Sequence, residues 1–463
     1  MVQTPTGLNG DQVRRLGETF DGDVILPADE TYDDARRLWN AVFDRRPAVI
    51  VRPTSRDDVA TAIRFAREHD LALAVRSGGH SASGHSSCDG GVVVDMSRMR
   101  GVSVDPATRM ARVNGGALLG ELDVAAQAYG LVCPTGVIGH TGVAGLTLGG
   151  GVGRLQRNFG LTIDNLRAVE LVTADGRFVR ASETEEPELF WAMRGAGWNF
   201  GIVTAFEFAL RPFGPDLHRG VHIYPATAAH EVWQVFEDYA AVAPDSVSMI
   251  YGISPPEAAA GGDPVVVVSY NHSGPADTAE HDTAGLRRGP EPSSVSTTSQ
   301  SYLEAQTAHD LVLGWGGRSF IAGLYADVVR PAALDAIVGH VADGRVGGDF
   351  SITAQRGAIA RVDEDATAFA GRAARFDLSA NANWPDADRD ESGRDWVREV
   401  MAVVEPDAIE GRYANENSDT GPDATRSIYG AAKLARLAGL KRTWDPDNVF
   451  RLNHNVDPAG GGG

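Results

Sequence analysis

A histidine that directly follows two glycines offers the clearest chemistry in the chain. His80 comes after Gly78 and Gly79 in the run Arg76-Ser-Gly-Gly-His-Ser81. Glycines have no Cβ, so their backbone N–H groups can crowd around an anion such as a phosphate. A ring nitrogen at the edge of such a loop can coordinate, act as a base or attack an electrophilic ring. A loop histidine hydrogen-bonded only to backbone fits this pattern equally well.

A second glycine-dense segment, 136–153, contains Gly149, Gly150 and Gly151. A triple glycine inside an apolar segment is costly in conformational entropy, which favours a function over a plain turn. Neither segment has the Gly-Lys-Ser/Thr of a Walker loop, and neither is a good match to the Rossmann Gly-x-Gly-x-x-Gly. Two such loops suggest a pyrophosphate held between them. A dinucleotide held without a Rossmann loop indicates FAD.

The elements predicted around these loops have, in outline, the arrangement of an α/β nucleotide-binding domain. Apolar runs, helical spacing and the turn residues Asp105-Pro106 and Asp175-Gly176 define them. Ser55 is expected to cap one helix and Pro187 to begin another. Strands are predicted at 47–53, 71–75, 92–95, 102–104, 110–113, 168–173, 177–180 and 201–210, and helices at 33–43, from 55, at 118–129 and from 187.

The character of the chain changes after Pro212–Pro215 and again near residue 410. The middle reads as antiparallel strands separated by helices, with loops at Gly261-Gly262 and 289–300. A helix is predicted at 425–440, followed by Trp444 and a short turn motif. The predicted strands of the middle part are 247–253, 265–270, 320–328, 351–354 and 375–380, and its helices are 331–341 and 394–404.

Composition excludes several classes of protein. The 463 residues suit two or three domains, and 43% hydrophobic with 22% charged residues indicates a globular protein. With 42 basic and 62 acidic residues the net charge is −20, which argues against binding nucleic acid or a membrane surface. No apolar run of spanning length occurs, and the polar N-terminus has no apolar leader segment, so the cytoplasm is expected.

Cysteine, histidine and lysine are informative by their scarcity or spacing. Cys88 and Cys133 are the only cysteines, which excludes a disulfide scaffold and a multi-cysteine metal site. The loop histidines His85, His140 and His272 lack the spacing of metal ligands, so no metal is predicted. Lysine occurs only at positions 433 and 441, which is typical either of codon bias or of adaptation to high salt.

Four motifs stand in order along the chain: Arg76-Ser-Gly-Gly-His-Ser81, Thr141-Gly-Val-Ala-Gly-Leu-Thr-Leu-Gly-Gly-Gly151, Asn199-Phe-Gly-Ile-Val-Thr204 and Asp445-Pro-Asp-Asn-Val-Phe-Arg451. Together they strongly resemble the berberine bridge enzyme-like flavin oxidases of the vanillyl-alcohol oxidase superfamily. The second motif is most similar to the bacterial 6-hydroxy-D-nicotine oxidase-like branch. The resemblance covers nearly the whole chain.

The resemblance implies an α+β fold with a two-subdomain, PCMH-type FAD-binding domain. This domain would comprise residues 1–215 and be completed by 410–463. Residues 216–409 would form a substrate domain, an antiparallel sheet backed by helices. FAD would be attached covalently through the 8α-methyl group to His80 alone. The other implied FAD contacts are Arg76, Ser77, Gly78, Gly79, Ser81, Gly139, Thr141, Gly142, Gly145, Leu146, Thr147, Gly149, Gly150, Gly151, Gly153, Gly201, Ile202, Val203, Asn453 and Asn455.

The sequence is less informative about the substrate. Tyr413-Ala-Asn-Glu416 matches a family strand, Tyr-x-Asn-Tyr/Phe, on which active-site tyrosines occur, so Tyr413 and Glu416 are the candidate bases. A packed strand tyrosine is as good an interpretation of Tyr413. Gln355 and Arg356 are expected on a sheet strand, more in a core or solvated role than in the pocket. Trp198 is expected to narrow the flavin region, and Gly371 stands where relatives often have histidine.

A second flavin link through Cys133 is not expected. Counting back from the triple glycine, the linking cysteine of doubly attached relatives falls near Ile138. Cys133 lies five residues earlier, which is up to roughly 17 Å of extended chain. A buried free cysteine is the simpler interpretation.

Three functions remain open on sequence alone. The first is a covalent flavoprotein oxidase that takes a hydride from an alcohol, amine or sugar-type small molecule, with O2 as the electron acceptor. The second is a flavin dehydrogenase that passes electrons to another acceptor. The third is a flavin-binding protein without turnover. The expected partners are therefore a small-molecule substrate and O2, with no nucleic acid and no membrane.

Overall fold

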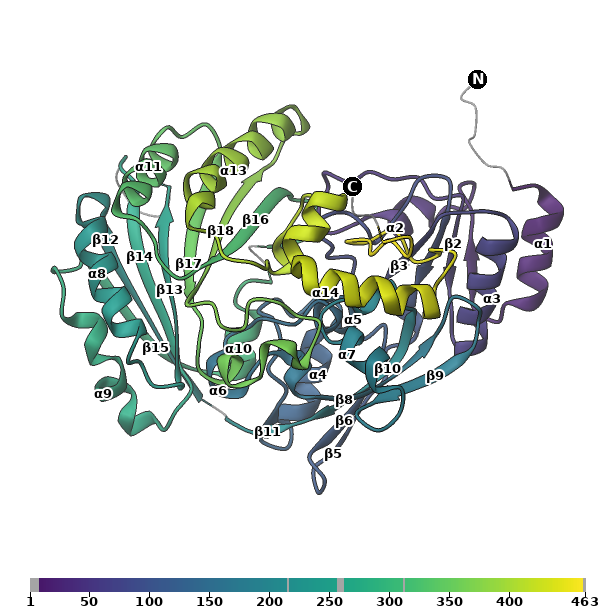
Figure 1. Ribbon diagram of the computed structural model, residues 1–463, viewed down its shortest axis with the longest axis horizontal. Helices are drawn as coiled ribbons and strands as arrows, with labels where there is room; N and C mark the ends of the chain where they lie inside the picture. Colours follow the sequence, from purple (N-terminus) through teal and green to yellow (C-terminus); the bar gives the residue numbers. More distant parts are fainter. Residues whose placement is uncertain (1–7, 215, 256–261, 311–312, 461–463) are drawn as a thin grey trace.

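The computed structural model describes residues 8–214, 216–255, 262–310 and 313–460. Two lobes lie side by side, one built on sheets of four and five strands and the other on a seven-stranded sheet (Figure 1). Helix α14 (Pro422–Trp444) runs across the middle of the molecule between the lobes. Helices and antiparallel sheets are mixed throughout, which confirms the predicted α+β class.

The four-stranded sheet is buried on both faces because most positions of its strands are apolar. Val49 and Val51 pack with α3 (Arg56–Glu68), and Ile50 packs on the opposite face with Tyr32. Helix α3 begins after Ser55, whose Oγ accepts a hydrogen bond from the Asp58 N–H as predicted. The strands, in sheet order, are β1 (Asp23–Ile25), β2 (Val49–Arg52), β4 (Val92–Asp95) and β3 (Leu73–Arg76), with β2, β4 and β3 parallel.

The five-stranded sheet is antiparallel, and both predicted hairpins occur in it. Strands β5 and β6 pair across the turn after Asp105, and β8 and β9 pair across Asp175-Gly176. Helices α4 (Leu119–Gln127), α7 (Pro187–Met193) and α14 share its hydrophobic core. In sheet order the strands are β5 (Val102–Asp105), β6 (Met110–Asn114), β10 (Ile202–Ala209), β8 (Leu166–Val172) and β9 (Phe178–Ser182).

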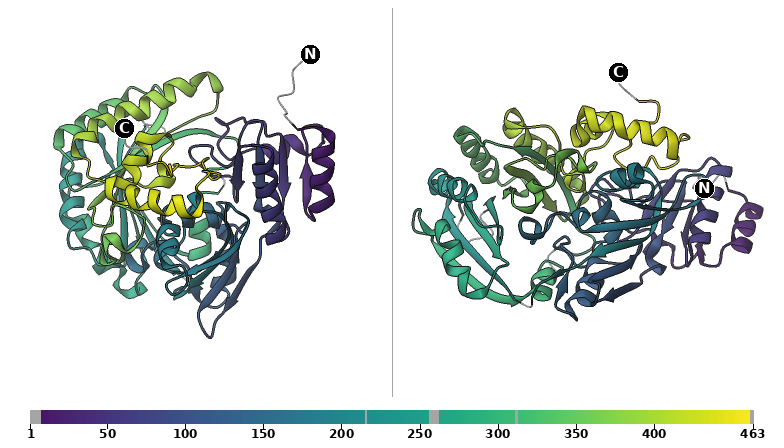
Figure 2. Two further views of the ribbon diagram at one scale, coloured as in Figure 1. Left: turned by 45° about the vertical axis from the view of Figure 1, so that its right-hand side comes forward. Right: turned by 60° about the horizontal axis from the view of Figure 1, so that its bottom comes forward.

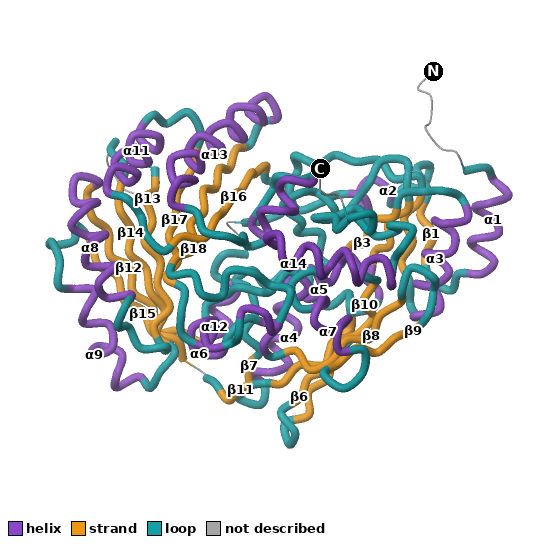
Figure 3. The backbone as a smooth tube through the Cα atoms, in the orientation of Figure 1, coloured by secondary structure: helices purple, strands orange, loops and turns teal. Residues whose placement is uncertain are grey.

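The seven-stranded sheet is antiparallel and carries three long helices on one face. Helices α8 (Ala229–Ala240), α11 (Pro331–Ala342) and α13 (Asp390–Val404) bury that face in one large core. Figures 2 and 3 show these helices on the side that points away from the first lobe. The order is β15 (Ser294–Ser301), β12 (Asp216–Pro225), β14 (Val265–His272), β13 (Val247–Ser254), β17 (Gly347–Ala354), β18 (Phe376–Trp384) and β16 (Arg318–Ala326).

The remaining elements are short. Among the described residues, no helix combines the length and apolar character needed to cross a membrane. The short elements are α1 (Gly10–Thr19), α2 (Tyr32–Arg36), β7 (Leu131–Val132), α5 (Val143–Leu148), α6 (Gln156–Phe159), β11 (Arg211–Pro212), α9 (Ala279–Thr283), α10 (Tyr302–Thr307) and α12 (Ala358–Arg361).

Two predictions of secondary structure were wrong. The helix expected at 33–43 ends at Arg36, because the chain beyond it reaches across to the second lobe, where Asn40 Nδ2 donates to the Ser319 carbonyl. The loop expected at 289–300 is largely the edge strand β15, which pairs only with β12. Its exposed β-branched residues suit an edge strand despite their low hydrophobicity. Of the predicted Gly261-Gly262 loop, Gly261 lies outside the described residues.

A buried ion pair fixes the end of α14 to the rest of the first lobe. Lys441 and Asp445 are both fully buried, with Nζ 2.6 Å from Oδ2. Lys441 Nζ also donates to the carbonyl oxygens of Asn199 and Phe450 at 2.8 and 2.9 Å. Asp445 accepts from the backbone N–H groups of Val449 and Phe450. The pair therefore joins α14, the turn after it and the segment before β10.

We expect Lys441→Met to destabilise the protein by about 3–5 kcal/mol, because it leaves Asp445 buried without a counter-charge. Urea unfolding measures the change. Arg98→Met is the matched control, since Arg98 pairs with Asp23 at 2.7 Å on the surface and its loss is expected to change stability by at most about 1 kcal/mol. Equal effects of the two substitutions would contradict the role given to the buried pair.

Candidate functional site

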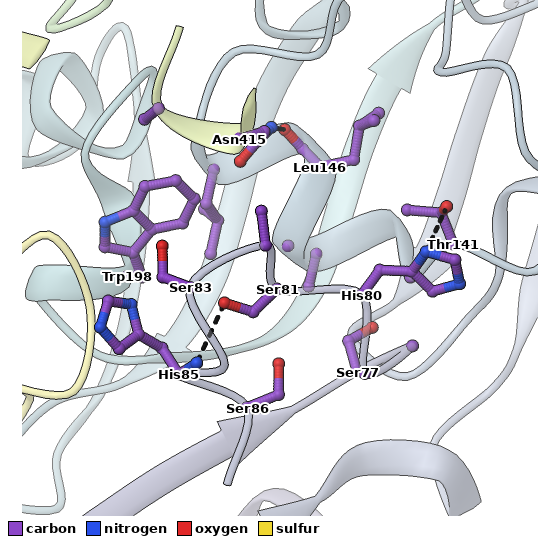
Figure 4. A pocket seen from close by; sticks show the side chains of 18 of the residues that line it. Ser77, His80, Ser81, Ser83, His85, Ser86, Thr141, Leu146, Trp198 and Asn415 are labelled. Carbon is purple, nitrogen blue, oxygen red and sulfur yellow. Dashed lines mark hydrogen bonds between the residues drawn. The ribbon is translucent and has the colours of Figure 1, made fainter. Parts of the chain in front are cut away.

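One cavity of about 440 Å³ brings the sequence motifs together. Its wall comes from the loop after β3, the segment before and within α5, the start of β10 and the C-terminal segment 450–454. The polar face of the seven-stranded sheet contributes residues of β16 and β18. The cavity therefore lies where the two lobes meet. Figure 4 shows part of this wall, with the His80 ring beside Thr141 and Ser81 further along the same loop.

His80 lies deep in the wall and is held on several sides. Its ring stacks on Trp39 with centroids 4.9 Å apart and planes 17° apart. Its Nε2 lies 2.7 Å from Nδ1 of His140, and its Nδ1 lies 3.4 Å from Thr141 Oγ1. Burial, with a smaller contribution from His140, lowers the pKa of His80 to about 3. The ring is therefore neutral at physiological pH and has one nitrogen without a hydrogen.

The two glycine loops touch through their backbones. A Cβ on Gly78 would lie 2.2 Å from the Gly142 nitrogen, and a Cβ on Gly142 would lie 2.2 Å from the Gly78 nitrogen. Neither loop can therefore carry a side chain at this point without being pushed away from the other. The result is a wall of backbone groups suited to a phosphate.

Most of the predicted FAD contacts line this cavity. They are Ser77, Gly78, Gly79, His80, Ser81, Thr141, Gly142, Gly145, Leu146, Gly201, Ile202, Val203 and Asn453. The structure places the others outside the wall: Arg76, Gly139, Thr147, Gly149, Gly150, Gly151, Gly153 and Asn455.

The residues outside the wall have packing partners of their own. Arg76 donates to the Ala35 carbonyl and lies over the Trp315 ring. Gly150 and Gly151 have positive φ angles of 129° and 83° and pack against Phe369 and Thr162. The triple glycine thus turns the chain tightly beneath the cavity, and direct contact between these glycines and FAD remains a prediction.

Three buried polar atoms in the wall lack a partner among the described residues: Trp198 Nε1, Asn453 Oδ1 and His454 Nδ1. Asn453 Oδ1 and His454 Nδ1 are buried and accept no hydrogen bond from the described residues. His454 Nε2 lies 3.0 Å from the Ala414 carbonyl, which can only accept, so Nε2 bears the hydrogen. Burial lowers the pKa of His454 to about 4, so its Nδ1 is an acceptor without a donor. Unsatisfied acceptors beside backbone N–H groups fit a ligand with both donors and acceptors, as a flavin ring with a pyrophosphate has.

Tyr413 and Glu416 both line the cavity, although not on the strand that sequence predicted. Tyr413 precedes a 3₁₀ helix, Ala414–Glu416, so the strand prediction was wrong. The hydroxyl oxygen of Tyr413 accepts hydrogen bonds from the Val152 N–H at 3.1 Å and from Asn415 Nδ2 at 2.9 Å. Burial and the nearby Glu416 nevertheless raise the pKa of Tyr413, so its phenol stays protonated.

Glu416 has the electrostatics of a base. Burial raises the pKa of its carboxyl group to about 7, where protonated and ionised forms are equally populated at neutral pH. Asp377 on β18 is buried, and burial followed by the Glu416 charge raises its pKa. Ionised Glu416 therefore favours the protonated form of Asp377. Among the described residues that line the cavity, Glu416 is the only Asp, Glu, Lys or Arg.

Sequence reasoning expected a sheet in the substrate domain but missed the residues of that sheet that line the cavity. Asp377, Ser379, Asn381 and Asn383 alternate with apolar residues along β18, and the apolar set packs in the core under the helices. Asn381 and Asn383 line the cavity, as do Ser319 and Ile321 of β16. This period-two pattern was visible in the sequence and indicates a polar sheet face turned towards the site.

The structure also shows where the other residues singled out by the sequence analysis lie relative to the cavity wall. Cys133 is fully buried and lies outside the wall, whereas Ile138 lines the cavity. Trp198 also lines it. Gln355 is buried, and its Nε2 donates to Asp377 at 3.4 Å. Gly371 has a φ of 86° and packs against Tyr325 rather than in the wall. Within the described ranges no group of three or more His, Cys, Asp or Glu could hold a metal ion.

Comparisons with known proteins agree with this geometry. Residues 47–182 match the model of an FAD binding domain, and residues 412–457 match the model described as berberine and berberine like. The chain is 32% identical to (R)-6-hydroxynicotine oxidase of Paenarthrobacter nicotinovorans, over 96% of this chain and 98% of that one.

Solved structures agree as well. The crystal structure of 6-hydroxy-D-nicotine oxidase from Arthrobacter nicotinovorans superposes with a TM-score of 0.84 at 30% identity, covering 95% of this chain and 98% of the other. A glucooligosaccharide oxidase from Acremonium strictum, described with a 6-S-cysteinyl, 8α-N1-histidyl FAD, has a TM-score of 0.86 at 24% identity, with 96% and 99% covered. This last likeness concerns the fold.

Proposed function

Because this chain belongs to the berberine bridge enzyme-like family of FAD-linked oxidoreductases, we propose that it is an oxidase with covalently bound FAD. It removes a hydride from an alcohol, amine or sugar-type small molecule and passes the electrons to O2. The observation that carries the proposal is one cavity lined by two touching glycine loops, a neutral histidine and a carboxyl group with a pKa near 7.

The PCMH-type fold supports a division of labour between the two lobes. We assign FAD to residues 1–215 together with 410–463, and the substrate to residues 216–409. FAD is attached through His80 only. The single link is supported by Cys133, which is buried away from the cavity and whose pKa burial raises, so that its thiol remains protonated and unreactive.

Each part of the wall has a task in this proposal. Bound FAD supplies the hydride acceptor. The backbone N–H groups around Gly78 and Gly142 hold the pyrophosphate, and Asn453 and His454 satisfy the polar edge of the ring system. The amide groups of Asn381 and Asn383 orient the substrate from the sheet side. Glu416 takes the proton from the substrate O–H or N–H as the hydride leaves.

Glu416 is preferred to Tyr413 as the base. A phenol whose pKa is raised by burial holds its proton at neutral pH, whereas the Glu416 carboxyl group is half ionised there. The Tyr413 hydroxyl already accepts two hydrogen bonds, so its own hydrogen is available to donate to a substrate oxygen or nitrogen. Tyr413 therefore orients, and Glu416 removes the proton.

A panel of alcohols, amines and sugars tests the oxidase function. We expect at least one compound to bleach the flavin absorbance without air and to release hydrogen peroxide in air. Stopped-flow mixing of the reduced enzyme with O2 then separates the alternatives. Slow reoxidation by O2 with fast reoxidation by an artificial acceptor would indicate a dehydrogenase. Bleaching by no member of the panel would favour a flavin-binding protein without turnover.

Covalent attachment is tested by acid precipitation. We expect the wild-type protein to retain yellow colour and in-gel fluorescence, and His80→Ala to lose both. His85→Ala is the matched control because His85 lines the same cavity but is not expected to bind FAD covalently. Peptide mass mapping is expected to find FAD on the His80 peptide alone. Release of all flavin by acid from the wild type, or a flavin-linked Cys133 peptide, would disprove the assignment.

The base is tested by the pH dependence of anaerobic flavin reduction. The ionised Glu416 is the active form, so the rate is expected to rise with pH through about 7 and then level off. Glu416→Gln should lower the rate by roughly 10²-fold or more and abolish this pH dependence. Tyr413→Phe should lower the rate less and keep the profile. A Glu416→Gln enzyme with the wild-type rate and profile would exclude Glu416 as the base.

A further inference from the structure

Two hydrogen-bonding contacts in a row connect His80 to the backbone of the second lobe, and a third contact lies on the other side of its ring. His140 Nε2 lies 3.3 Å from the carbonyl oxygen of Asp310. His140 Nδ1 lies 2.7 Å from His80 Nε2. His80 Nδ1 lies 3.4 Å from the hydroxyl of Thr141. His140 was considered from sequence only as a possible metal ligand, and the proposed function gives it no role.

When both imidazole rings are neutral, the chemistry of the end groups assigns every hydrogen in this chain of contacts. A carbonyl oxygen can only accept, so Nε2 of His140 bears a hydrogen. In neutral His140 the other nitrogen, Nδ1, is then bare and accepts from Nε2–H of His80. Since His80 is neutral, its Nδ1 is bare as well, and the Thr141 hydroxyl donates to it. The backbone carbonyl of Asp310 thus determines, through His140, which tautomer His80 adopts.

We propose that His140 is a positioning residue that keeps His80 Nδ1 bare and receives the Nε2 hydrogen as a proton when His80 bonds to the flavin. The inference rests on the proposed attachment through His80. In this step Nδ1 bonds to the carbon of the flavin 8-methyl group, which loses one proton. His80 loses the Nε2 proton to His140. The electron pair of the broken C–H bond stays on the flavin until dioxygen takes two electrons and two protons to form hydrogen peroxide.

The surroundings of His80 support this role. Stacking on Trp39 fixes the plane of the ring, and the contacts at Nε2 and Nδ1 fix its orientation within that plane. Burial keeps the ring neutral, because it lowers the pKa to about 3. A neutral but wrongly protonated ring would present an N–H to the flavin and could not attack. Control of the tautomer is therefore needed at this position, and His140 is the group that contacts Nε2.

Reconstitution of the full-length protein with FAD tests the inference. Protein produced under riboflavin limitation is mixed with FAD, and acid-stable fluorescence is followed in time. We expect His140→Leu to slow covalent attachment by roughly 10²-fold or more, the scale expected of proton transfer by a positioned group. His140→Asn should be slowed less, because its Oδ1 can occupy the Nδ1 position and accept from His80. FAD affinity is compared in His80→Ala with and without His140→Leu and is expected to be equal.

A second readout follows the tautomer itself. Histidine ¹⁵N NMR of the flavin-limited protein, with His80 assigned by the His80→Ala spectrum, is expected to show a bare Nδ1 and a protonated Nε2. His140→Leu should alter this pattern. A protonated Nδ1 in the wild type, or attachment at the wild-type rate in His140→Leu, would overturn the inference. Absence of acid-stable flavin from wild-type protein would instead refute attachment through His80, so the two failures are distinguishable.

Discussion

The backbone contact between Gly78 and Gly142 is the constraint on which the site depends. Each position excludes even a methyl group, because a Cβ would lie 2.2 Å from the other residue's nitrogen. His80 stands two residues after the first glycine and His140 two residues before the second. Their 2.7 Å contact therefore follows from the approach of the two backbones. The same contact builds the wall of N–H groups, so the anion site and the histidine pair have one structural origin.

The contact between Gly78 and Gly142 is important because the described part of the cavity wall offers an anion backbone N–H groups but no cationic Lys or Arg side chain. Although the chain has 42 basic residues, the part that the structure describes places no Lys or Arg in the cavity wall. The two lysines are buried elsewhere, each surrounded by three oxygen acceptors: Lys433 contacts Glu364 twice and Phe369 once, and Lys441 contacts Asp445 and two carbonyls. A compact ammonium suits such a cage better than a planar guanidinium. A chain that otherwise uses arginine thus retains lysine where three oxygens converge.

Much of the first lobe could be predicted from sequence, because its strands are continuous apolar runs and its turns contain Asp-Gly or capping residues. The limits of β4, Val92–Asp95, were correct to the residue. Prediction failed where tertiary contacts override local pattern, as for the polar edge strand β15 and for the 3₁₀ helix before Asn417. Within the site, His80 and Glu416 were identified by motif. Asp377 and His140 were not, because their neighbours are 39 and 60 residues away along the chain and no local signal reports such proximity.

The cavity wall begins at Trp39 and ends at His454, so nearly the entire length of the chain contributes to it. Such a site has a high contact order: Trp39 Nε1 donates to the Leu313 carbonyl, and the wall residues from Phe450 to His454 are synthesised after all the others. During translation the first lobe can begin to fold, but the wall around His80 is not yet closed. A chain that ends before residue 450 would therefore lack part of the wall around His80.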